Sequence, residues 1–194
     1  MDRHQAIQGV KRCSWCGDDP LYVQYHDHEW GVPLQDDQKL FEFLVLESAQ
    51  AGLSWITILR KREGYRQAFA HFDPVKVAKF GEKDVARLMA CPDIVRNEKK
   101  IRSAIGNAQC FLDVITEFGS FRDYSWRFVG GKPKVNRWKT LKDVPPITQE
   151  SEAFAKDLKK RGFRFLGPTT VYAHMQAAGM VNDHLIDCFR HQEV

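Results

Sequence analysis

Two widely separated pairs of cysteine and histidine are the side chains in this sequence with the clearest chemistry. His184 and Cys188 are one helical turn apart, so a helix there would place two metal ligands on one face. Cys13 and His26 complement them near the N-terminus. Four such ligands fill a tetrahedral zinc shell and leave no position for water, so this metal would hold the fold rather than do chemistry. Either pair alone is weak evidence, because this spacing also occurs by chance.

Other thiols and rings near the first pair are rival ligands. Cys16 forms a Cys-x-x-Cys pair with Cys13, and His28 lies two residues after His26. The chain has five cysteines and no apolar signal segment at its N-terminus. An odd number of cysteines without a secretory signal favours thiols or metal ligands over a disulfide framework.

Glu47 is the candidate for function. It lies seven residues after Leu40 and three after Leu44, on the apolar stripe of a predicted helix. Burying a charged group without a partner costs several kcal/mol. The ordinary interpretation is that Glu47 lies at the edge of the stripe or pairs with a core arginine. The functional one is that it lines a cavity and accepts hydrogen bonds from a ligand.

Aromatic residues are concentrated around this glutamate in the sequence. Each of them alone is more often a core residue, yet residues 25–30 mix rings with charged groups, which is poor packing material. Rings beside an isolated carboxylate would suit a flat, electron-poor base that carries exocyclic N–H donors. The candidate substrate-binding residues are Tyr25, Trp55, Trp15, Trp30 and Tyr22.

The elements that must position these residues are helices, and the fold class that we predict is all-α. Apolar periodicity and capping residues predict the helices, and no alternating run is long enough for a convincing sheet. Short extended pieces are expected only at 22–23 and 163–166. The helices are expected at 36–51, from Ser54 onward, from Asp73-Pro74, at 82–90, at 99–118 and from Ser151 to Gly162.

Residues 151–179 have a helix–hairpin–helix layout. Gly167 and Pro168 open the second helix, and the free amides at such an end can receive a DNA phosphate. A plain α-hairpin has the same pattern and remains the alternative. The candidate DNA-binding residues are Gly167, Thr169, Thr170 and Arg164.

Composition and charge are those of an ordinary globular protein that has a polyanionic partner. The 194 residues are 43% hydrophobic and 28% charged, with a net charge of +4. Basic residues cluster at 96–102, 132–139 and 159–164, which favours a polyanion, although each cluster alone could be a solvated helix face. No apolar run is long enough to span a bilayer, so we expect a cytoplasmic protein with no membrane partner.

Several blocks of this sequence resemble the 3-methyladenine DNA glycosylase I family, of the helix–hairpin–helix glycosylase superfamily. The resemblance extends from about Arg12 to Cys188, and Cys16 is a departure from the family pattern. The blocks that carry it are Arg12-Cys-Ser-Trp15, Asp19-Pro-Leu-Tyr22, Tyr25-His-Asp-His-Glu-Trp-Gly-Val-Pro33, Leu46-Glu-Ser-Ala-Gln-Ala-Gly-Leu-Ser-Trp55 and Val181-Asn-Asp-His184.

The resemblance implies a helix–hairpin–helix glycosylase bundle in one domain, residues 1–194. A structural zinc, held by Cys13, His26, His184 and Cys188, would tie an N-terminal arm (about 12–33) to the C-terminal helix (about 180–190). Residues 1–11 would be a poorly ordered extension. Asp183 is a candidate to orient the ring of His184.

The resemblance also implies an activity. The enzyme would flip a cationic base out of alkylated double-stranded DNA, read it with Glu47, Tyr25 and Trp55, and release 3-methyladenine by hydrolysis. It would act as a monomer, without lyase activity. Two rival interpretations are a non-enzymatic zinc-stabilised DNA-binding module and a zinc hydrolase with an open metal position.

Overall fold

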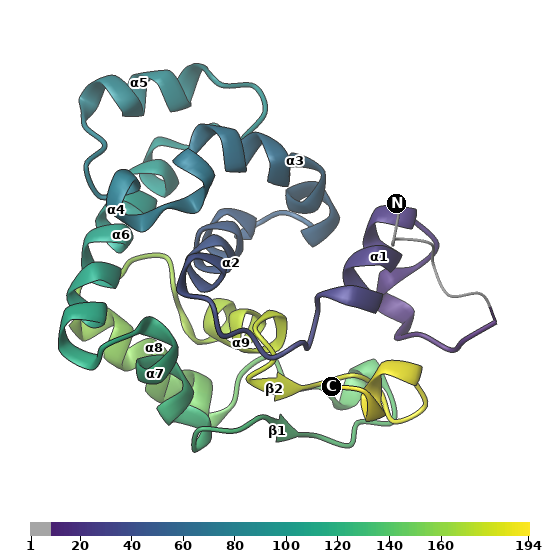
Figure 1. Cartoon of the computed structure of the whole chain (residues 1–194). Coiled ribbons are helices and arrows are strands. Elements are labelled where there is room, and N and C mark those ends of the chain that lie inside the picture. The colour runs from purple at the N-terminus through teal and green to yellow at the C-terminus, as the bar shows by residue number, and fades with distance from the viewer. Residues whose placement is uncertain (1–8) are drawn as a thin grey trace.

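The chain folds into packed helices with one very small sheet (Figure 1). The computed structural model describes residues 9–194. The α-helices are α1 (Pro20–His28), α2 (Asp37–Gln50), α3 (Trp55–Ala68), α4 (Pro74–Val77), α5 (Glu82–Ala90), α6 (Glu98–Phe118), α7 (Phe121–Trp126), α8 (Gln149–Lys160) and α9 (Pro168–Ala177). Short 3-10 turns are η1 (Ser14–Cys16), η2 (Ala70–Phe72), η3 (Arg127–Val129), η4 (Leu141–Asp143) and η5 (Phe189–Gln192).

Most predicted helices are confirmed, and side-chain caps mark where α2 and α4 begin, whereas Ser54 precedes α3 without a cap hydrogen bond. Asp36 accepts a hydrogen bond from the amide of Lys39 and begins α2. Two predictions near caps are wrong. The cap of α8 is Thr148, and Ser151 is the third helical residue, which closes a capping box with it. Residues 22–23 are not extended, because Asp19 caps α1 and Pro20 occupies its first position.

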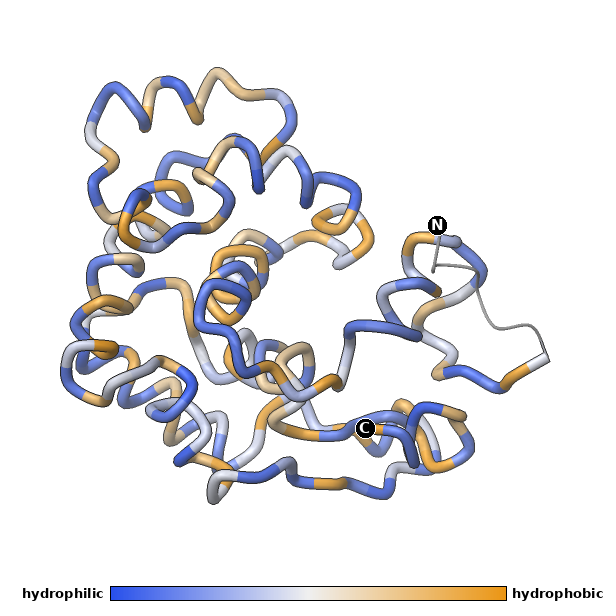
Figure 2. The backbone as a smooth tube through the Cα atoms, in the orientation of Figure 1, coloured by the Kyte–Doolittle hydropathy of each residue, from blue (hydrophilic) through white to orange (hydrophobic). Residues whose placement is uncertain are grey.

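Helix α2, which carries Glu47, lies at the centre of the molecule (Figures 1 and 2). Ten of its fourteen residues are buried. It packs against α3, α6, α7 and α9, so it has no broad solvent face. A helix covered on all sides makes any charged residue on it costly.

The N-terminal arm is held against the end of α9. The amide of Gly31 donates to the carbonyl of Gln176 (3.1 Å), and that of Leu34 donates to the carbonyl of Ala178 (3.0 Å). Gly179 has φ +66°, and a Cβ there would overlap the backbone of Val32. This close approach requires glycine. Residues 1–8, most of the extension expected before Arg12, lie outside the described residues.

The C-terminal segment differs from the prediction. Strands β1 (Lys134–Val135) and β2 (Val181–Asn182) form a parallel two-stranded sheet, which the sequence pattern did not indicate because the strands are so short. The expected last helix is absent from residues 183–188, where the chain turns between β2 and η5. A hydrogen bond from the amide of Cys188 to the carbonyl of Leu185 (2.8 Å) closes this turn.

No helix within residues 9–194 is both long and apolar enough to cross a lipid bilayer.

Lys100 belongs to a predicted basic cluster, but its side chain is used inside the fold. Its ammonium donates to the carbonyls of Ala49 (2.8 Å) and Ala51 (2.7 Å), at the C-terminal end of α2. Lys100→Met should therefore lower the free energy of unfolding by about 1 kcal/mol, measured by urea denaturation. Lys99→Met changes an exposed neighbour and should have no measurable effect. Equal stabilities for the two variants would contradict this role of Lys100.

Candidate functional site

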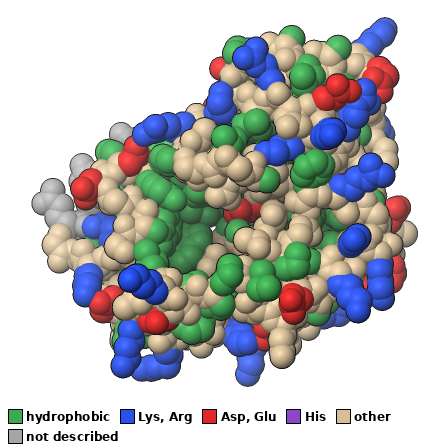
Figure 3. All heavy atoms as spheres, turned by 180° about the vertical axis from the view of Figure 1, so that it is seen from behind, with side chains coloured by type: hydrophobic (Ala, Val, Ile, Leu, Met, Phe, Trp, Pro, Cys, Tyr) green, Lys and Arg blue, Asp and Glu red, His purple; other side chains and the backbone are tan. Residues whose placement is uncertain are grey.

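A cavity of about 370 Å³ opens between the N-terminal arm, α2, α3, α9 and residues 141–146. Figure 3 shows a hollow on the face opposite to that viewed in Figure 1, walled mainly by hydrophobic side chains. The cavity brings together all six residues predicted for the substrate site, namely Trp15, Tyr22, Tyr25, Trp30, Glu47 and Trp55.

The aromatic side chains pack on one another as a continuous wall. Trp15 lies 5.0 Å from both Tyr22 and Trp30, measured between ring centroids, and Tyr25 lies 5.5 Å from Trp55. Most ring pairs are tilted or edge-on, the arrangement that aromatic quadrupoles favour. Burial raises the pKa of Tyr25 well above its usual range, so its hydroxyl stays protonated. The wall can receive a flat ring and exclude water from it.

Glu47 is buried at this cavity without a partner. Its side chain is 4% exposed, and its Oε2 atom has no hydrogen-bond partner among residues 9–194. Burial raises the pKa of its carboxyl group to about 8. The indole N–H of Trp55 also lacks a partner. A buried polar atom that is left unpaired at a cavity is available to a ligand.

The alternative of a core arginine applies to Glu42, not to Glu47. Glu42 accepts from Arg62 Nε (2.6 Å) and Arg66 Nη2 (3.0 Å). Burial by itself would raise the pKa of Glu42, but Arg62 and the other cations lower it below its usual value. Two glutamates on one helix therefore have opposite environments, and only Glu47 remains unpaired.

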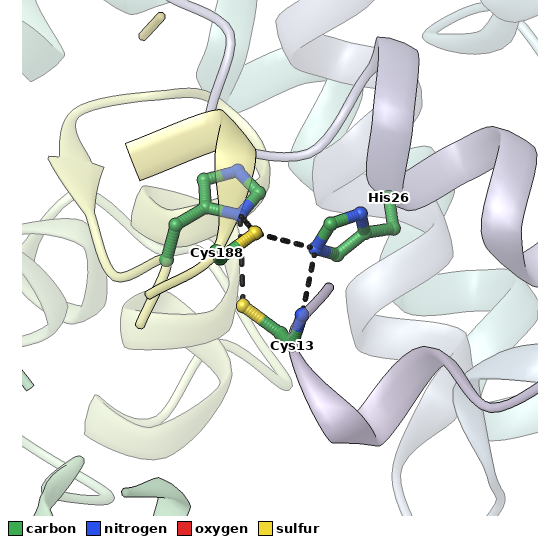
Figure 4. A group of neighbouring side chains, drawn as sticks. Cys13, His26 and Cys188 are labelled. Carbon is green, nitrogen blue, oxygen red and sulfur yellow. Dashed lines mark hydrogen bonds between the residues drawn. The ribbon is translucent and has the colours of Figure 1, made fainter. Parts of the chain in front are cut away.

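The four predicted metal ligands converge in one buried group. Figure 4 labels Cys13, His26 and Cys188 of this group. The ligand atoms of all four residues lie within 4.8 Å of one another. Cys188 Sγ is 3.4 Å from His26 Nε2 and 3.5 Å from His184 Nδ1, and Cys13 Sγ is 3.7 Å from His184 Nδ1. Sulfur and nitrogen ligands on a tetrahedral zinc ion are about 3.5 Å apart. The group could hold a metal ion.

Hydrogen bonds orient both imidazole rings of this group. His26 Nδ1 contacts Asp27 Oδ1 (2.8 Å), and Arg12 holds the same carboxylate. His184 Nε2 contacts the carbonyl oxygen of Trp30 (3.1 Å). Such contacts orient the other ring nitrogen of each imidazole toward the two thiols, and His26 Nε2 also accepts from the amide of Cys13 (3.3 Å). Trp30 thus links the metal-binding group to the cavity, because its ring lines the cavity wall.

The rival ligands are not part of this group within residues 9–194. The Cys16 thiol donates to the carbonyl of Cys13 (3.2 Å) instead, and His28 is exposed. Asp183 does not orient His184, because its carboxylate is occupied by donors from α9 and from residues 136–138.

The hairpin between α8 and α9 opens beside the cavity. Gly167 precedes α9, and Gly167, Thr169 and Arg164 are exposed while Thr170 is half-buried. Thr169 also lines the cavity. Asn107 pairs with the backbone of Arg164 through two hydrogen bonds (2.8 and 2.9 Å), so α6 braces the hairpin.

Sequence reasoning missed the part of the cavity that comes from α9 and from residues 141–146. Tyr172 and Gln176 are four residues apart and face the cavity together. That spacing was the available signal on α9. Residues 141–146 carry no comparable pattern, because only the tertiary fold brings them to the cavity.

Comparisons with known proteins agree on one family. The family model for methyladenine glycosylase matches residues 15–191. DNA-3-methyladenine glycosylase 1 of Escherichia coli (strain K12) is 51% identical over 92% of this chain and 96% of its own. DNA-3-methyladenine glycosylase of Haemophilus influenzae (strain ATCC 51907 / DSM 11121 / KW20 / Rd) is 49% identical over 91% and 96%. A structure of 3-methyladenine DNA glycosylase I from Staphylococcus aureus, which concerns 3-methyladenine recognition, has a TM-score of 0.89 and 44% identity, over 92% of this chain and 95% of that one.

The raised pKa of Glu47 predicts how Glu47→Gln changes stability. Burial raises this pKa from 4.5 to about 8, so the folded state keeps a proton that the unfolded state releases between these values. The wild-type protein therefore loses stability as pH rises from 4.5 to 8, and loses no more above 8. Relative to wild type, Glu47→Gln should gain on the order of 4 kcal/mol between pH 5 and pH 8.5 in urea denaturation. A stability difference that does not change with pH would show that Glu47 is not buried in its neutral form.

Proposed function

The chain belongs to the methyladenine glycosylase family, and on that premise we propose that it excises 3-methyladenine from alkylated DNA. The reaction is hydrolysis of the bond between the damaged base and its deoxyribose. The observation that carries the proposal is the unpartnered carboxyl oxygen of Glu47 in a cavity walled by aromatic rings. This arrangement can select a flat cation that carries N–H donors.

The base itself supplies much of the driving force. An adenine methylated at N3 within DNA is positively charged, so it leaves as a neutral molecule and needs no proton from the enzyme. The task of the site is then to hold the flipped base and to favour the positive charge that develops on the sugar. The aromatic faces contribute about 1–2 kcal/mol toward a desolvated cation.

Glu47 is the residue that we assign to base selection. A cation in the cavity favours the ionised carboxylate, so binding of the lesion releases the proton that burial retains in the free enzyme. The carboxylate then accepts hydrogen bonds from the amino edge of the base and neutralises its charge. Normal adenine carries no charge, draws less stabilisation from this site and remains a poor leaving group.

Hydrolysis without lyase activity is consistent with the lining of the cavity. None of the described residues that line it is a lysine, the side chain that would form a Schiff base with the sugar. Trp15, Tyr22, Tyr25, Trp30 and Trp55 are assigned to base binding.

Double-stranded DNA is the partner that we assign to the hairpin face. The amides at Gly167, Thr169 and Thr170 begin α9 and can bind a phosphate, with Arg164 exposed beside them. These contacts carry no sequence information, which suits an enzyme that scans for damage. We propose that the chain acts in the cytoplasm as a monomer and as a single glycosylase domain.

Zinc is the metal that we assign to the group of Cys13, His26, His184 and Cys188. Two thiols, two imidazoles and their spacing suit tetrahedral zinc. With four protein ligands the ion has no open position, so it would tie the arm to the C-terminal turn and take no part in hydrolysis. This opposes the zinc-hydrolase interpretation.

Replacing Glu47 tests the proposal directly. Glu47→Gln should lower single-turnover release of 3-methyladenine from methylated duplex DNA by about 100-fold, while DNA affinity changes little. For wild type, kcat/KM should rise with pH toward about 8 and then level off, because the ionised carboxylate reads the cation. The variant should lack that dependence. Glu82→Gln changes a carboxylate on α5 outside the cavity and serves as the matched control.

Two results would contradict the proposal. Wild-type protein that binds duplex DNA but releases no base would favour the non-enzymatic DNA-binding module. Unchanged excision by Glu47→Gln would refute the assignment of Glu47.

Metal removal separates a structural ion from a catalytic one. We expect elemental analysis to find about one zinc per chain. A chelator should abolish excision only as fast as the arm unfolds, and tryptophan fluorescence measures that unfolding. Trp30 reports on it, because its ring lines the cavity and its carbonyl contacts His184. Immediate loss of activity with unchanged fluorescence would instead indicate catalysis by the metal.

A further inference from the structure

A second buried carboxylate lies at the cavity, and it is surrounded by donors. Asp183 is 2% exposed and lines the cavity together with Glu47. Its Oδ1 atom accepts from Asn136 Nδ2 and Trp138 Nε1, and its Oδ2 atom accepts from the Tyr172 hydroxyl and Gln176 Nε2. All four distances are 2.7 Å.

These contacts use the whole acceptor capacity of the group. An ionised carboxylate has about four lone-pair sites, and each oxygen of Asp183 receives two donors. To take a proton or to orient a water molecule, Asp183 would have to lose one of them. Glu47 is the opposite case, since its Oε2 atom has no partner. The two carboxylates are therefore suited to different tasks.

The donors come from two separate parts of the chain. Tyr172 and Gln176 belong to α9, while Asn136 and Trp138 follow β1 in a segment with little regular structure. This segment leads to Leu141, Val144, Pro145 and Pro146, which form one part of the cavity lining. Between β1 and α8 the segment has only the short turn η4, so its own secondary structure does little to fix that lining.

Neighbouring contacts reinforce the same junction. The carbonyl of Trp138 accepts from the amide of Ile186 (3.0 Å), and the carbonyl of Asn136 contacts His191 Nε2 (2.8 Å). The backbone of residues 136–138 is thus attached to the C-terminal segment. The side chains of Asn136 and Trp138 add the link through Asp183 to α9.

We propose that Asp183 is a positioning residue that fixes the cavity lining formed by residues 141–146 against α9. The inference rests on the proposed function, because its effect on excision presumes that the cavity receives the base. Asp183 shapes the space that the base enters and does not react with water or sugar. Hydrogen bonds to a charged group are among the stronger ones in proteins, so loss of a single donor should be measurable.

Trp138→Phe is the most informative variant, because it removes one donor and leaves Asp183 itself intact. It should weaken binding of free 3-methyladenine about tenfold in isothermal titration calorimetry and lower excision by a similar factor. Amide hydrogen exchange should become faster in residues 139–146. The shape of the pH profile should not change, because Asp183 takes no proton in the reaction.

Trp126→Phe is the matched control. Trp126 is buried in α7, and its indole N–H has no partner, so the same replacement there removes no hydrogen bond. It should leave base affinity and exchange in residues 139–146 unchanged. Asp183→Asn should act in the same direction as Trp138→Phe and more strongly, since an amide N–H₂ would then face two donors.

The outcomes distinguish this proposal from the function on which it rests. One result would overturn the positioning role. If Trp138→Phe kept base affinity and excision within twofold of wild type while Asp183→Asn was inactive, Asp183 would act directly in the reaction. Unchanged exchange in residues 139–146 of Trp138→Phe would also overturn the positioning role. If Trp138→Phe showed faster amide exchange but the wild-type protein released no base, the positioning of the lining would be upheld and the glycosylase function refuted.

Discussion

The free-energy cost of burying Glu47 without a partner is the constraint on which the site depends. Helix α2 is covered by α3, α6, α7 and α9, so Glu47 has no route to solvent along its own helix. Within the described part of the chain no cation pairs with it, and burial raises its pKa to about 8. Replacing it with an apolar residue would remove that cost. The proposed function gives this residue a ligand, because a methylated purine would supply the missing charge and hydrogen bonds.

The metal-binding group and the base cavity are two ends of one arrangement. The arm from Arg12 to Pro33 supplies two of the four metal ligands and four of the aromatic residues at the cavity. Trp30 belongs to both, since its carbonyl contacts His184 and its ring faces the cavity. Under the proposed function, a metal ion at this group would contribute to substrate binding indirectly, by fixing the aromatic wall of the cavity.

The cavity places two carboxylates in contrasting states, and neutral donors rather than opposite charges make the difference. Asp183 accepts hydrogen bonds from four N–H and O–H groups, whereas Glu47 has an oxygen with no partner among the described residues. A buried carboxylate with all its lone pairs occupied is held rigidly and has no acceptor site left for a ligand. A carboxyl group with an unpaired oxygen can still accept a hydrogen bond from a ligand. Under the proposed function, the group that shapes the cavity and the group that binds the base are therefore different carboxylates.

The sequence by itself determined the helices with strong periodicity or caps, the four metal ligands and the identity of Glu47 as an anomalous residue. Those features depend on local spacing or on residue type, which a single chain displays directly. Its local patterns misplaced the cap of α8, predicted a last helix where residues 183–188 form a turn, and suggested that Asp183 orients His184. Only the tertiary structure decided that Glu42 rather than Glu47 meets Arg62, that Lys100 caps α2, and that residues 136–146 reach the cavity through Asp183. The hydrogen bonds concerned join residues that are 20 to 51 positions apart in the sequence. No local pattern specifies which distant donor meets which acceptor.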